Sequence, residues 1–151
     1  MSTFRPPITF TMPGAPKGWE RAGKNGATHF TRSEHQAQMD AIAWRARSAR
    51  VAEITGPVRL DVVAVFGMPS SWLHNRVMKM RGCPVVKAPD FDNLAKLVAD
   101  ALEPIAYKRD AQISIGTTVK IWGLTPRTII SLTPIQDDEP VDLPWLEGVE
   151  P

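Results

Sequence analysis

The segment DNLAKLVADALEP, residues 92–104, carries an apolar stripe that only a helix gathers on one face. Its apolar residues recur at the spacing i, i+3, i+4, i+7 and i+8, which is the period of an α-helix: Leu94, Leu97, Val98, Ala101 and Leu102. Pro104 cannot continue a helix and predicts its end. Because such a helix must bury its apolar face, the chain needs a sheet or a second helix to receive it.

Four other segments alternate apolar and polar residues, which is typical of half-buried strands. The expected strands are 8–12, 58–66, 112–122 and 127–133. Ser33-x-x-Gln36 resembles a capping box, so a second helix is predicted over 34–50, and residues 68–86 are predicted to form a long loop. This β-α-β-α-β-β order favours an α+β single domain, with a small mixed β-sheet and two main helices packed on it.

Charge is distributed unevenly along the 151 residues. Residues 136–151 hold six acids and no lysine or arginine, which leaves 18 basic against 10 acidic residues, a net charge of +8, in residues 1–135. We therefore predict a domain over 1–135 that favours a polyanionic partner. The acidic, proline-containing segment 136–151 is predicted to be a poorly ordered tail.

Cysteine usage and hydropathy narrow the class of protein. A single cysteine, Cys83, excludes an internal disulfide and suits a reducing compartment. The first residues, MSTFRPPITF, lack the pattern of a signal peptide. No run approaches the roughly 18 apolar residues of a membrane span. We expect a cytoplasmic protein without a membrane partner.

The stretch KAPDFDN, residues 87–93, places Asp90 and Asp92 at the start of the predicted helix. Acids in this position ordinarily cap the helix or favour the positive end of its dipole. Two carboxylates so close repel each other unless a cation lies between them, which points to a metal ion. Lys96 lies four residues after Asp92, a spacing that predicts a surface ion pair.

A third acid, Asp110, begins the next strand. The helix rises about 18 Å, and residues 104–109 extended reach about 20 Å, so Asp110 can return to the helix start. Three converging carboxylates would suit Mg²⁺, with Mn²⁺ as a substitute. In a basic protein this indicates phosphodiester hydrolysis, with Lys96 offsetting charge on the phosphate.

The residues KAPDFDNLAKLVADAL followed by DAQI resemble the RusA-like Holliday junction resolvases, whose pattern is K-P-D-x-D-N-L-x-K…D-A-L…D-x-Q-[IV]. The resemblance spans 87–113. It implies a homodimeric, Mg²⁺-dependent endodeoxyribonuclease that resolves four-way DNA junctions by paired symmetric nicks in DNA recombination and repair. It assigns the catalytic residues Asp90, Asp92, Lys96 and Asp110, the three aspartates being the metal ligands. Ala88 is inserted relative to the pattern, and Arg109 stands where many members have another aspartate.

Basic residues of the two predicted loops and their flanks are the candidate DNA contacts. They would bind the DNA backbone without reading sequence: Lys17, Arg21, Lys24, Arg32, Arg76, Lys79, Arg81, Lys87 and Arg109. Trp19, Phe30 or Trp72 could stack on exposed bases at the branch point, or simply pack in the core.

Two other functions fit the acidic pair. A noncatalytic DNA-binding or architectural protein would use the acids as caps only, and would not depend on a divalent metal. A DxD-type metal-dependent transferase is the other, but the sequence contains no dinucleotide-type glycine fingerprint and no Walker loop.

Overall fold

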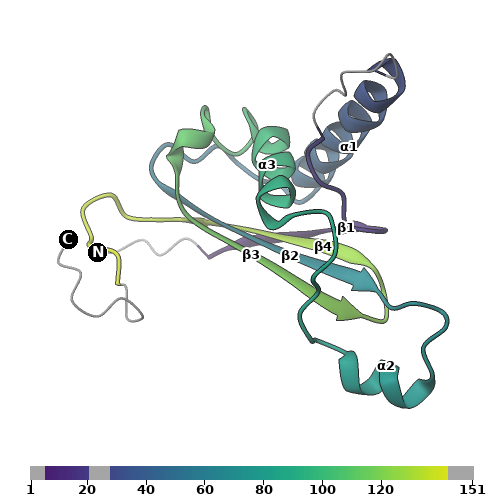
Figure 1. Cartoon of the computed structure of the whole chain (residues 1–151). Coiled ribbons are helices and arrows are strands. Elements are labelled where there is room, and N and C mark those ends of the chain that lie inside the picture. Colours follow the sequence, from purple (N-terminus) through teal and green to yellow (C-terminus); the bar gives the residue numbers. More distant parts are fainter. Residues whose placement is uncertain (1–5, 21–27, 143–151) are drawn as a thin grey trace.

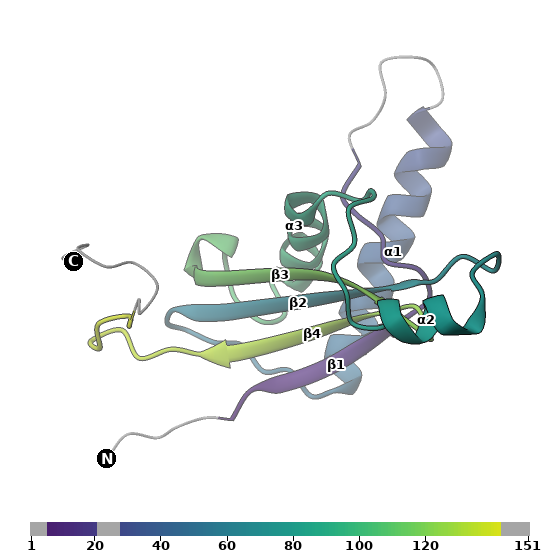
Figure 2. The ribbon, with the colours of Figure 1, turned by 60° about the horizontal axis from the view of Figure 1, so that its bottom comes forward.

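The structure, a computed structural model, describes residues 6–20 and 28–142, except for the side chains of 28–32. Four strands form one sheet in the order β1-β4-β2-β3 (Figures 1 and 2). They are β1 (Ile8–Pro13), β2 (Val58–Gly67), β3 (Ile113–Gly123) and β4 (Arg127–Pro134). β2 pairs with β3 in parallel and with β4 antiparallel, and β1 pairs with β4 antiparallel. The predicted mixed sheet is confirmed.

Two long helices, α1 (Thr28–Ser48) and α3 (Phe91–Leu102), cover the same face of this sheet (Figure 1). The five apolar residues that predicted α3 are all buried. Leu97 and Leu102 pack in one core with Ile42 of α1 and Ile130 of β4. The α+β class with two main helices on one sheet is therefore confirmed. Within the described ranges, no helix is long and apolar enough to cross a membrane.

β2 shows how the sheet separates its two faces. Val58, Leu60 and Val62 are buried beneath the helices, as their alternation predicted. Val63 points to the opposite face, where it pairs in register with Val119 of β3. The described helices leave this second face uncovered, and Val119 is 38% exposed there. Arg59 and Asp61 lie on this face as well, so its apolar part is a patch around Val63 and Val119.

The start of α1 differs from the prediction. The helix begins at Thr28, five residues before Ser33, so Ser33 lies inside the helix and the predicted capping box is wrong. Gly26 is the last helix-breaking residue before this segment. Since neither glycine nor proline occurs between Thr28 and Ser48, nothing in the sequence prevents the helix from starting early.

The predicted loop 68–86 also contains a short helix, α2 (His74–Met80), and none of its seven residues, all described, is buried. The chain after it runs along the outer edge of β3. The amides of Gly82 and Val85 donate to the carbonyls of Trp122 and Lys120 at 2.8 and 3.0 Å, and the Trp122 amide donates to the Cys83 carbonyl at 2.9 Å. These bonds hold the α2 segment at one end of the sheet and cover part of an edge strand (Figure 1).

The connection from α3 to β3 is anchored by Tyr107, which is fully buried. Its hydroxyl donates to the carbonyl of Ala99 in α3 at 2.7 Å. Burial raises the pKa of Tyr107, and the negative charges of Asp110, Glu103 and Asp100 raise it further. The hydroxyl therefore remains a neutral donor that fixes the loop leading to Asp110.

The predicted tail begins after β4. The amide of Ile135 still donates to the carbonyl of Pro57 at 2.9 Å, so the chain is tied to the domain at this residue. Asp137, Asp138 and Glu139 are exposed, and residues 143–151 lie outside the described residues. The division at residue 135 and the disorder of the tail remain predictions.

We predict that Tyr107→Phe destabilises the protein by about 0.5–1.5 kcal/mol near neutral pH, because only the hydrogen bond to Ala99 is lost. As pH rises above about 10, tyrosine ionises in the unfolded chain while the folded protein retains the proton, so wild-type stability falls. The phenylalanine variant lacks this fall. The difference in free energy of unfolding between wild type and variant should therefore be smaller at high pH than near neutral pH. Urea unfolding near pH 7 and near pH 11 measures this difference. An equal difference at both pH values would contradict a raised pKa of Tyr107 in the folded protein.

Candidate active site

A cavity of about 420 Å³ lies between α3 and the parallel pair β2 and β3. Leu60 and Val62 form its apolar floor. Its charged residues come from α3 and from the short 3-10 helix η1 (Asp110–Gln112) that precedes β3: Asp92, Lys96, Asp100 and Asp110. The fold thus brings the helix start and the strand start to one hollow, as the reach of residues 104–109 permitted.

The first turn of α3 does not use its acids as ordinary caps. Asp90 occupies the N-cap position, yet in the described part of the chain its side chain makes no capping hydrogen bond. Its backbone carbonyl accepts a hydrogen bond from the Leu94 amide at 3.1 Å. Asp92 accepts a hydrogen bond at 2.9 Å from the amide of the adjacent Asn93. The exposed carboxylate of Asp90 therefore remains available for a ligand.

Asp110 is positioned by Gln112, whose amide is bonded on both sides. Its Oε1 accepts from the Lys108 amide at 3.0 Å, and its Nε2 donates to the carbonyls of Ile54 and Gly56 at 2.8 and 3.0 Å. These bonds fasten η1 to the segment that precedes β2. Gln112 belongs to the DAQI motif, and its position in the sequence indicated no role; the structure shows that it holds the turn on which Asp110 lies.

Lys96 pairs with Asp100 at 3.4 Å rather than with Asp92, so the predicted Asp92–Lys96 ion pair is wrong. The Lys96 ammonium also lies 5.1 Å from the centre of the Trp19 ring. The Trp19 amide donates to the Asn93 carbonyl at 2.8 Å, which docks the segment after β1 on the start of α3. Trp19 is thus a packing and cation-binding residue of this site.

The three acids expected to bind metal are only partly brought together. Asp92 and Asp110 line the cavity, whereas Asp90 is absent from the described residues that line it. Across the described ranges, no group of three or more His, Cys, Asp or Glu side chains is close enough to hold a metal ion. The two convergent carboxylates are oxygen ligands of the kind that Mg²⁺ prefers. The predicted convergence is therefore seen for two acids and not for the third.

Two further cavity residues were missed by the sequence reasoning. Asp100 continues the i, i+4 series of Asp92 and Lys96, a periodicity that could have identified it. Phe91 lines the mouth of the cavity and is 66% exposed. Single exposed apolar side chains are common on protein surfaces, so its exposure alone assigns Phe91 no role.

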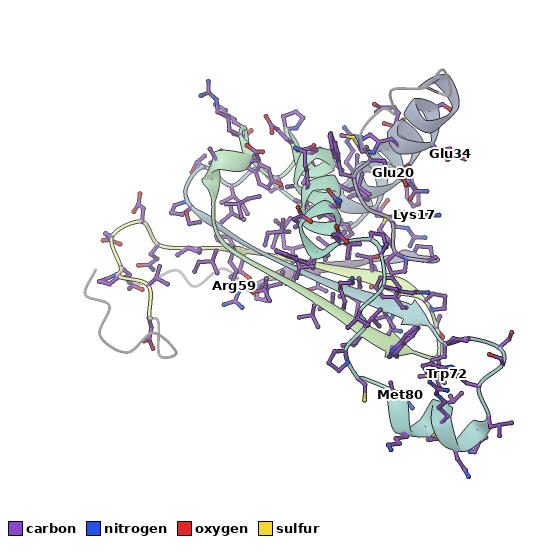
Figure 3. All side chains as sticks on the ribbon, viewed as in Figure 1. Lys17, Glu20, Glu34, Arg59, Trp72 and Met80 are labelled. Carbon is purple, nitrogen blue, oxygen red and sulfur yellow. The ribbon has the colours of Figure 1, made fainter. Side chains whose placement is uncertain are left out.

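The basic residues predicted to bind DNA fall into separate places. Arg21 and Lys24, and the side chain of Arg32, lie outside the described residues. Lys17 lines a different hollow beside α1, together with Glu20 and Glu34 (Figure 3).

The remaining predicted contacts lie nearer the cavity or at the α2 end. Arg109 immediately precedes Asp110 as the N-cap of η1. Arg76 and Lys79 lie on α2, Arg81 follows it, and Lys87 lies between it and α3. DNA binding by any of these residues stays a prediction.

Comparison with known proteins decides the family. The family described as Endodeoxyribonuclease RusA matches residues 13–133, which include the whole cavity. The chain belongs to the RusA endodeoxyribonuclease family. It is also similar to the uncharacterized protein YqaN of Bacillus subtilis (strain 168), with 32% identity over 125 residues that cover 79% of this chain and 86% of that protein. The predicted RusA resemblance is confirmed, and with it the class of endonucleases that act on DNA.

We predict that Gln112→Ala destabilises this RusA-family protein by about 1–3 kcal/mol, because the carbonyls of Ile54 and Gly56 lose their donor. Gln112→Glu should cost at least as much, since its second carboxylate oxygen would face the carbonyl oxygens of Ile54 and Gly56 with no proton to donate. Thermal or urea unfolding measures both effects.

Ser114→Ala is the matched control, because Ser114 is exposed and its hydroxyl donates only a long hydrogen bond, at 3.4 Å, to the Gln112 carbonyl among the described residues. It should change stability by less than about 0.5 kcal/mol. If Gln112→Ala lowers the free energy of unfolding no more than Ser114→Ala does, the hydrogen bonds of the Gln112 side chain contribute little to stability.

Proposed function

We propose that this RusA-family protein resolves Holliday junctions by paired symmetric nicks through Mg²⁺-dependent phosphodiester hydrolysis, in DNA recombination and repair. The observation that most supports it is the cavity in which Asp92, Asp110 and Lys96 converge. Carboxylates and a lysine on an apolar floor combine what metal binding and phosphate stabilisation require.

The proposed metal ligands are Asp90, Asp92 and Asp110, with Mg²⁺ preferred and Mn²⁺ as a substitute. When bound, such a metal supplies Lewis-acid polarisation of a phosphate and activation of water. Asp92 and Asp110 line the cavity already, whereas the Asp90 side chain must turn toward them. The absence of a capping bond to the Asp90 side chain, within the described residues, leaves it able to do so.

The other cavity residues have proposed roles that follow from their contacts. Lys96 offsets negative charge on the phosphate, and its pairing with Asp100 holds the ammonium at the cavity wall. Leu60 and Val62 keep the floor apolar, which strengthens electrostatic interactions above it. Phe91 supplies an exposed aromatic face to a base beside the cleaved phosphate.

We also propose a homodimer. A four-way junction with two-fold symmetry needs two opposed nicks, and a C2 dimer presents two equivalent sites. The uncovered sheet face, where Val63 and Val119 lie in register, supports this proposal because a second copy would remove it from water.

The test of activity is cleavage of a synthetic four-way junction with Mg²⁺, beside a linear duplex. Asp92→Asn and Asp110→Asn should each reduce paired nicking by at least about a hundredfold, since even the outer partners of metal ligands change activity by about ten- to a hundredfold. Junction binding should persist, because removing a negative charge does not weaken attraction to phosphate.

Asp40→Asn is the control variant. It removes one negative charge from α1, where this carboxylate accepts a hydrogen bond from Gln36 at 2.9 Å, away from the cavity. Its nicking should match the wild type. Junction binding without nicks under Mg²⁺ or Mn²⁺ would instead favour an architectural DNA-binding protein. Metal-dependent transfer of a sugar or a nucleotide would favour a DxD-type transferase.

The dimer is tested by light scattering at micromolar concentration, which should give twice the monomer mass. Val119→Glu places a charge on the uncovered sheet face and should yield monomers. Val141→Glu, a change at a residue that is 47% exposed beyond β4, is the control and should remain dimeric. Equal dimer content in both variants would place the subunit interface elsewhere.

A further inference from the structure

The charge of the folded chain is polarised along the sheet. Residues 62–89 and 111–135 contain no Asp or Glu at all, although the whole chain has 16. These two ranges form the end of β2, the α2 segment, β3 and β4, which lie together in the fold. They contain six basic residues: Arg76, Lys79, Arg81, Lys87, Lys120 and Arg127. No acidic residue within these two ranges offsets the six positive charges, so this part of the molecule carries a net positive charge.

Three aromatic rings connect the α2 segment with the end of the sheet. Trp72 and Trp122 lie 5.1 Å apart between ring centres. Figure 3 places Trp72 where the α2 segment meets the end of the sheet, far from Arg59. Phe66 pairs in register with Trp122 across β2 and β3. The rings form the support on which the neighbouring cations lie.

Each ring carries a cation. The Arg76 guanidinium lies 4.3 Å from the centre of the Trp72 ring. The Lys87 ammonium lies 5.4 Å from Trp122 and 5.5 Å from Phe66.

The third cation, Lys120, lies 5.7 Å from the centre of the Phe66 ring, and its ammonium also donates to the backbone carbonyl of Lys87. We call this set the aromatic–cation cluster: Phe66, Trp72, Arg76, Lys87, Lys120 and Trp122.

No described carboxylate pairs with the cations of this cluster. Within the described residues, Arg76, Lys87 and Lys120 have no ion pair with a carboxylate, in contrast to Lys96 and Lys108. An aromatic face attracts a cation by about 0.5–1 kcal/mol at an exposed site without neutralising it. It also restrains a long side chain, so less conformational entropy is lost when an anion binds. The cluster is thus a prepared anion-binding surface.

The cluster lies on the same face of the sheet as the active-site cavity. Thr118 lines the cavity, and Lys120 and Trp122 follow it on the same side of β3. A strand advances about 3.3 Å per residue, so Lys120 lies about 7 Å beyond Thr118 along β3. A DNA strand rises about 3.4 Å per nucleotide, so this distance corresponds to about two nucleotides. Lys87 is also only three residues from Asp90.

We propose that the aromatic–cation cluster binds the phosphate backbone of the DNA arm that leaves the cavity toward α2. Lys120, supported by Phe66, is a DNA-binding residue in this arrangement, and the tryptophans serve as supports for cations. Trp72 is half-buried between Arg76 and Trp122, so it does not act as a wedge between bases. The proposal rests on the proposed DNA substrate but concerns binding alone.

The test measures binding of a fluorescent four-way junction by anisotropy, in Ca²⁺ or EDTA so that no cleavage intervenes. Lys120→Gln should weaken binding about three- to tenfold near physiological salt and lower the slope of log Kd against log salt by about 1. Lys120→Arg retains the charge and should restore both values to within about twofold of the wild type.

Lys108→Gln is the matched control, because Lys108 is an exposed lysine that pairs with Glu53 at 4.0 Å, beyond the other end of α3. Equal weakening by Lys108→Gln and Lys120→Gln would overturn the proposal, since overall charge would then explain the effect. Wild-type affinity of Lys120→Gln for the junction would also overturn the proposal, even if the wild-type protein nicked the junction and so proved to be a nuclease. Conversely, selective loss with Lys120→Gln in a protein that never nicks would support the cluster and refute the proposed cleavage.

Discussion

The structure depends on the burial of one face of α3 against the sheet. Leu97, Leu102 and their neighbours occupy the same core as Val58, Ile130 and Leu132. This packing places the polar face of α3, with Asp92, Lys96 and Asp100, above the parallel strands β2 and β3. The cavity exists because the helix is held over the sheet while its opposite side remains polar. Loss of that apolar contact would remove the site as well as the stability.

The parts of the fold with strong periodicity were predictable. The stripe of α3 and the alternation of β2 gave the elements, their buried faces and the α+β class. α1 begins before Ser33, although Ser33 has the pattern of a cap. No glycine or proline lies between Gly26 and Ser33, and a local capping signal is weaker than a continuous run of helix-compatible residues. α2 is only seven residues long and none of them is buried. No apolar face of this helix packs on the core, so the sequence shows no helical apolar stripe there.

The site was predictable in its residues more than in its contacts. The chain length between α3 and β3 permitted Asp110 to approach Asp92, and both line one cavity. The partner of Lys96 was not predictable, because Asp92 and Asp100 lie at equal spacing on either side of it and only the folded geometry selects one. The role of Gln112 depends on Ile54 and Gly56, which are far away in the sequence.

The parallel pairing of β2 and β3 has a consequence for how activity arises during folding. β3 can join β2 only after the chain between them, residues 68–112, has crossed the sheet. Contacts between such distant segments form slowly, because a long loop must be closed before they contribute. Asp92 lies within that crossing and Asp110 near its end, so the cavity that both acids line requires the pairing of β3 with β2. A nascent or partly unfolded chain could retain α3 and its acids yet lack the cavity. The capacity to act on DNA is thereby confined to the completed fold.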